Sequence, residues 1–89
     1  MDANKLLDQI AEFFKDGKLL TVRDVMELVN RGIPVTDVDY IAMPTIKWAV
    51  LRLEQLHKLT RRTEQGKVLF RVTVVKTGYD LKSATNEEN

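Results

Sequence analysis

Apolar residues in the first third of the chain recur at the spacing of two amphipathic helices. Between residues 5 and 14 they fall three and four positions apart, which places them on one helical face. Gly17 follows, and glycine can adopt the left-handed conformation that ends a helix. A second apolar stripe covers 22–31, and at its start Thr21-Val22-Arg23-Asp24 approximates a capping box formed by Thr21 and Asp24. The sequence therefore predicts two helices whose apolar faces lie in the core.

The middle of the chain predicts a structured connector followed by a third helix. Residues 33–44 run between two prolines and show no clear period, so we expect a connector there. Asp37 and Asp39 could instead bind a metal, but no third ligand is apparent. Thr45 can serve as the N-cap of a helix over 45–58. The apolar positions of this helix are Ile46, Ala49, Val50, Leu53 and Leu56.

After this helix the spacing of apolar residues changes to the two-residue period of β-strands. Residues 59–63 form one predicted strand, and 68–75, rich in β-branched and aromatic residues, form the next. The link between them contains Gly66, which is typical of a hairpin turn. Earlier in the chain, Leu19-Leu20 is long enough only for a short edge pairing.

Length and composition limit the classes of protein that fit this pattern. The 89 residues, of which 44% are hydrophobic, suit one domain with a modest core. Because the chain has no cysteine, disulfide frameworks and thiolate zinc sites are excluded. The N-terminus lacks a secretory signal pattern and no apolar stretch is long enough to span a bilayer. We expect a soluble cytoplasmic protein without a membrane role.

The net charge of +1 conceals a basic block. Residues 1–44 carry five Lys/Arg and eight Asp/Glu, whereas 45–76 carry eight Lys/Arg and two Asp/Glu. Residues 77–89 carry one Lys and three Asp/Glu. Such a block is typical of a phosphate-binding face, although an ordinary solvated face has the same composition.

The order of helix, short extended piece, two helices and hairpin resembles the winged helix-turn-helix family. The resemblance rests mainly on the segment TIKWAVLRLEQLHKLTRR, residues 45–62. It implies an α+β winged helix-turn-helix fold, with three helices followed by a two-stranded β-hairpin wing, over 1–78, and a polar tail over 79–89. The chain departs from the family in one respect. About a dozen residues separate its second and third helices, which in the family are usually joined by a short turn.

The resemblance implies sequence-specific binding of double-stranded DNA by a small transcriptional regulator. Helix 45–58 would enter the major groove, and hairpin 59–75 would lie on the backbone or in the minor groove. The predicted DNA-binding residues are Thr45, Lys47, Trp48, Arg52, Arg61, Arg62, Lys67 and Arg71. Lys47 and Arg52 could pair with phosphate or guanine. Neighbouring strand residues face opposite ways, so Arg61 and Arg62 cannot both face the same surface.

Several alternatives stay open at this stage. Trp48 could be a partly buried core residue, a DNA contact or a dimer contact. A homodimer could form through Phe13 or Phe14, or through 74–79. The domain could also be a protein-interaction module, recognised by an apolar patch around Trp48 and Leu51. No catalytic set, metal site, cofactor motif or small-molecule site can be assembled, and the lone His57 suits a helix C-terminus. We therefore expect no enzyme activity.

Overall fold

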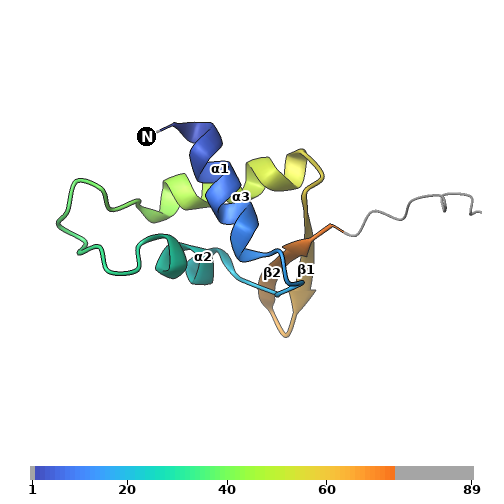
Figure 1. Ribbon diagram of the computed structural model, residues 1–89. Coiled ribbons are helices and arrows are strands. Elements are labelled where there is room, and N and C mark those ends of the chain that lie inside the picture. The colour runs from blue at the N-terminus through green and yellow to red at the C-terminus, as the bar shows by residue number, and fades with distance from the viewer. Residues whose placement is uncertain (1, 74–89) are drawn as a thin grey trace, which may run out of the picture.

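The computed structural model describes residues 2–73 as an α+β fold of three helices followed by an antiparallel hairpin (Figure 1). The elements are α1 (Ala3–Phe13), α2 (Val22–Val29), α3 (Met43–Gln55), β1 (Leu59–Glu64) and β2 (Lys67–Val72). This order confirms the predicted succession of elements. The predicted tail over 79–89, the end of the second predicted strand and the dimer segment 74–79 lie outside the described residues.

The first two helices begin at side chains that cap them. Asp2 Oδ1 accepts from the Asn4 N–H at 2.9 Å, which places the start of α1 at Ala3. At α2 the predicted capping box is present. Thr21 Oγ1 accepts from the Asp24 N–H, and the Asp24 carboxylate accepts from the Thr21 N–H, both at 3.0 Å. These bonds satisfy amides that the first helical turn leaves without partners.

The start of α3 corrects the prediction that Thr45 is its N-cap. The helix begins at Met43, its N-cap is Ala42, and no side chain caps it. Pro44 lies inside the first turn, where a missing N–H is harmless and the fixed φ of proline suits the helix. Thr45 is therefore an exposed residue of the first turn.

The end of α3 also differs from the prediction, because the helix stops at Gln55 rather than continuing to residue 58. His57 adopts a left-handed conformation with φ 61°. Its N–H donates to the Glu54 carbonyl, and the Lys58 N–H donates to the Leu53 carbonyl, each at 2.9 Å. This pair of bonds is a Schellman motif, which ends the helix and turns the chain into β1. Leu56, a predicted core position, is 42% exposed.

Replacing His57 with glycine should stabilise the protein. A non-glycine residue in the left-handed region loses roughly 1 kcal/mol to steric crowding, and glycine removes that penalty. We expect His57→Gly to raise the free energy of unfolding by up to about 1 kcal/mol, measured by urea denaturation. His57→Ala, which keeps a Cβ, is the matched control and should give no gain. Equal stability of the two variants would contradict the assigned conformation.

The hairpin has a tight two-residue turn, and an isolated β-bridge joins its second strand to Leu20. Gln65 and Gly66 both have positive φ, 51° and 78°, as a type I′ turn requires. Leu20 pairs with Phe70 through two backbone hydrogen bonds of 2.9 and 2.8 Å. The predicted short edge pairing near Leu20 is thus confirmed as an isolated bridge to β2 of the two-stranded sheet.

The core lies where the three helices meet the inner face of the hairpin. Figure 1 shows α1 crossing α3, with α2 packed beside them and the hairpin extending from the end of α3. The buried apolar residues are Leu6, Ile10, Phe14, Val25, Val29, Ile46, Ala49, Val50, Leu53, Leu59 and Phe70. Phe14 is fully buried in this cluster, so it cannot be the dimer contact considered from the sequence.

Asn30 fixes the long connector between α2 and α3. Its side chain is 7% exposed and makes two hydrogen bonds of 2.8 Å with the backbone of Ile41. The amide nitrogen donates to the Ile41 carbonyl, while the amide oxygen accepts from the Ile41 N–H. Between these ends the connector forms turns and extends away from the helices (Figure 1). Its end, immediately before the N-cap of α3, is therefore held against α2.

Candidate nucleic-acid interface

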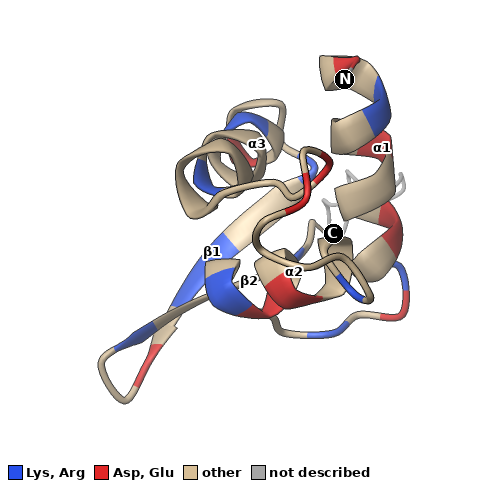
Figure 2. Ribbon diagram, turned by 90° about the vertical axis from the view of Figure 1, so that its left-hand side faces the viewer, with Lys and Arg blue, Asp and Glu red and all other residues tan. Residues whose placement is uncertain are grey.

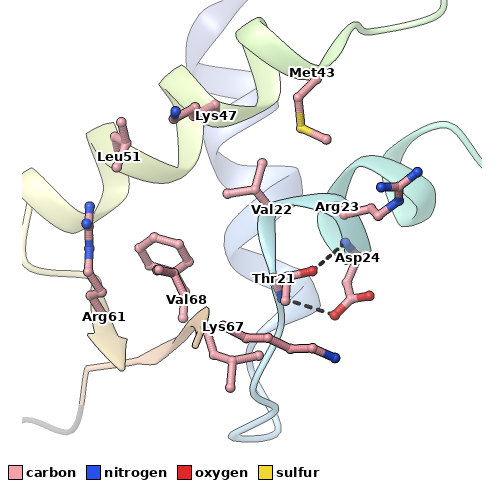
Figure 3. Close-up of a pocket in the computed structure, with 12 residues that line it drawn as sticks. Thr21, Val22, Arg23, Asp24, Met43, Lys47, Leu51, Arg61, Lys67 and Val68 are labelled. Atoms are coloured by element: carbon pink, nitrogen blue, oxygen red, sulfur yellow. Dashed lines mark hydrogen bonds between the residues drawn. The ribbon is translucent and has the colours of Figure 1, made fainter. Parts of the chain in front are cut away.

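A groove of about 790 Å³ lies between α3, the beginning of α2 and the hairpin (Figure 3). Met43, Lys47 and Leu51 of α3, which are spaced four residues apart and therefore share one helical stripe, line one side. Residues 21–24, at the start of α2, line another. The hairpin completes the groove with Arg61 and residues 67–70.

The charge of the groove is mainly basic. Four of its lining residues are cationic, namely Arg23, Lys47, Arg61 and Lys67, and one, Asp24, is acidic. In Figure 2 the blue segments of β1 and of the beginning of α2 lie next to each other on one side of the molecule. The Asp24 carboxylate already accepts the Thr21 N–H. The groove therefore favours an anionic partner.

Arg23 was not among the residues predicted from the sequence. It lies in the acidic first half of the chain, so the charge distribution did not select it. The available signal was its position two residues after the N-cap Thr21, at the exposed start of a helix. Side chains and amides at such a position can meet phosphate.

Arg61 lies in the groove but is held by an acidic partner. Its Nε and Nη2 donate to the two carboxylate oxygens of Glu54 at 3.2 and 3.0 Å. The guanidinium also lies 5.5 Å from the centre of the Phe70 ring. This arrangement joins α3 to β1, and it gives Arg61 a positioning role in addition to its charge.

Arg62 lies on the other face of the hairpin from Arg61, as strand alternation predicts. Its Nε forms an ion pair of 2.6 Å with Glu64 on the same strand. Arg71 is paired in register with Thr60, on this same outer face. Neither Arg62 nor Arg71 lines the groove. Lys67, at the start of β2, is exposed and does line it.

The predicted contacts on α3 are divided between two sides of the helix. Thr45 and Trp48 line a second, smaller hollow of about 360 Å³ together with the start of α1 and the end of the connector. Arg52 is exposed and donates to Gln55 at 3.4 Å. Arg52 follows Lys47 by five positions, which places the two side chains about 140° apart around the helix. Lys47 alone of these four residues faces the groove. Trp48 is 49% exposed.

Residues 2–73 contain neither a metal-binding cluster nor a membrane-spanning helix. In that range, no three acidic or histidine side chains gather closely enough to hold a metal ion. Nor does any of its helices have the length and apolar character needed to cross a bilayer. Compared with known proteins, the chain matches no family model, no curated protein and no solved structure.

Proposed function

We propose that the chain is a winged helix-turn-helix domain that binds double-stranded DNA through the groove face. In this proposal α3 enters the major groove and the hairpin lies along the backbone or in the minor groove. The order α1, Leu20 bridge, α2, α3 and hairpin supports it, because the resemblance to the winged helix-turn-helix family rests on the same order. The role we propose is that of a small transcriptional regulator.

One observation carries the proposal: three separate elements place cations around the same groove. Arg23 comes from α2, Lys47 from α3 and Lys67 from β2. Within residues 2–73 none of the three forms an ion pair, so their charge is available for phosphate. A groove bordered by a helix and a hairpin, both bearing cations, suits the two phosphate rows of a duplex.

The structure changes the roles that we propose for the other predicted residues. Arg61 positions the hairpin through its ion pair with Glu54. Arg62 and Arg71, on the outer face, are proposed only as backbone contacts at the margin of the interface. Thr45, Trp48 and Arg52 lie away from the groove and are available to a second copy of the chain, in keeping with a homodimer on a two-fold site.

The experiment that tests this function is a salt titration with purified protein and a labelled random-sequence duplex, followed by fluorescence anisotropy. Each phosphate contact contributes a slope of about −0.9 to log K against log salt. We expect Lys47→Gln and Lys67→Gln each to reduce the slope by about one, because each removes one contact. Lys5→Gln, on the exposed surface of α1, is the control and should leave the slope unchanged. Absence of wild-type binding at low salt would refute the proposed function.

A further inference from the structure

We propose that the groove also binds an extended peptide segment that carries both acidic and apolar side chains. This inference goes beyond duplex binding and does not depend on it. It arises because the lining of the groove offers two kinds of contact, and a nucleic-acid backbone can use only one of them.

The apolar part of the lining comes from all three sides of the groove. Val22, Met43 and Leu51 are partly buried, and Phe70 forms part of the core. Val68 is 41% exposed on the hairpin. In Figure 3 the side chains of Leu51, Val22 and Val68 surround the hollow from α3, α2 and β2. Leucine, isoleucine or phenylalanine side chains of a partner would bury this surface, whereas phosphate groups would not.

The charged part of the lining selects an acidic partner. Arg23, Lys47 and Lys67 border the apolar surface and form no ion pair within residues 2–73, whereas Arg61 is paired with Glu54 and Asp24 is engaged in the capping box. Carboxylates placed on either side of an apolar anchor would meet these cations. Charge complementarity therefore favours an acidic peptide over a neutral or basic one.

The backbone of β2 supplies a reason to expect an extended conformation. The N–H and C=O of Phe70 both bond to Leu20, on the side of β2 away from β1. Because hydrogen-bonding directions alternate along a strand, the N–H and C=O of Val68 point to that same side. The Leu20 pairing is a single bridge and does not reach Val68. An extended peptide could bond to these two groups, as in strand addition at a sheet edge.

The proposal can be tested with displayed libraries of random 12-residue peptides. Peptides would be selected on immobilised wild-type protein, and the enriched sequences would be synthesised with a fluorescent label. We expect enrichment in Asp or Glu together with Leu, Ile or Phe. Binding should weaken about tenfold in Lys47→Glu and about fourfold in Val68→Thr, which replaces one methyl group of the lining with a hydroxyl. Circular dichroism would verify that each variant is folded.

Two matched controls distinguish the groove from the rest of the surface. Lys58→Glu changes an exposed lysine outside the groove, and Val38→Thr changes a connector valine that is 98% exposed. Neither should affect peptide binding. No enrichment over the input library, or enriched peptides whose affinity is equal in Lys47→Glu and Lys58→Glu, would overturn the inference. Peptides that need carboxylates but bind Val68→Thr as tightly as wild type would also overturn it, because charge alone would explain them.

Competition separates this inference from the proposed function. Peptide and duplex would use the same cations, so a bound peptide should displace labelled duplex. Peptide binding without any duplex binding would retain the inference and refute the proposed function. Duplex binding without peptide enrichment would retain the proposed function and refute the inference.

Discussion

Reversing the charge of both groove lysines, Lys47→Glu together with Lys67→Glu, should weaken duplex binding by about a hundredfold at roughly 0.1 M salt. At that salt, losing one phosphate contact lowers affinity by a factor of about eight, so losing two lowers it by about sixty. The two new carboxylates add repulsion to this loss. The effect should shrink as salt rises, because both the contacts and the repulsion are screened.

The control for this pair is a double reversal that has the same net charge. Lys5→Glu with Lys15→Glu changes one exposed lysine of α1 and one in the turn that follows it, and both lie outside the groove. Fluorescence anisotropy at matched salt should show a much smaller loss for this variant. If the two double variants lose affinity equally, overall charge governs binding and the groove is not the interface. Arg52→Gln should likewise have little effect, because Arg52 lies on another side of α3 from Lys47.

Replacing Asn30 with alanine should lower the free energy of unfolding by about 2–4 kcal/mol. The substitution removes two hydrogen bonds of 2.8 Å to Ile41 and leaves two backbone groups of that residue without their partners. Each unsatisfied group costs about 1–3 kcal/mol when water reaches it poorly. Ile41 is half-buried, so the total should fall within the stated range rather than above it.

Urea denaturation followed by circular dichroism would measure this change. Asn4→Ala, at an exposed position of α1, is the control and should change stability by less than about 0.5 kcal/mol. A loss below about 1 kcal/mol for Asn30→Ala would show that the two bonds contribute little. Because Ile41 immediately precedes the N-cap of α3, the variant should also weaken ligand binding at the groove under conditions where it remains folded.

The existence and order of the elements could be predicted because they depend on local patterns. The 3.6-residue and two-residue periods, the Thr21 cap and the Gly66 turn are all visible in the sequence. The ends of α3 could not be placed in this way. Pro44 is acceptable inside the helix only because it falls in the first turn. His57 occupies a left-handed position where the sequence signal would normally be glycine.

The candidate site was predictable only in part, because it depends on pairings between elements. Charge selected Lys47, Arg61 and Lys67, which the groove does bring together. Charge could not reveal that Glu54 holds Arg61, because that contact joins α3 to β1. It also missed Arg23, whose neighbours in the sequence are largely acidic or apolar. The spacing of Lys47 and Arg52 along α3 shows that they lie on different sides of the helix. Which of those sides faces the hairpin depends on how the helix packs in the fold.

The junction between α3 and β1 has a consequence for how the groove can respond to a partner. The Schellman motif, the Glu54–Arg61 ion pair and the bond from the Thr73 N–H to the Lys58 carbonyl, 3.0 Å long, all act within a few residues of one another. Because these contacts tie the end of α3 to both strands, we expect the helix and the hairpin to keep a fixed relative orientation. A partner must fit a fixed opening, and little ordering entropy is lost when it does. Selectivity at this groove would then come from shape that exists before binding rather than from closure around the ligand.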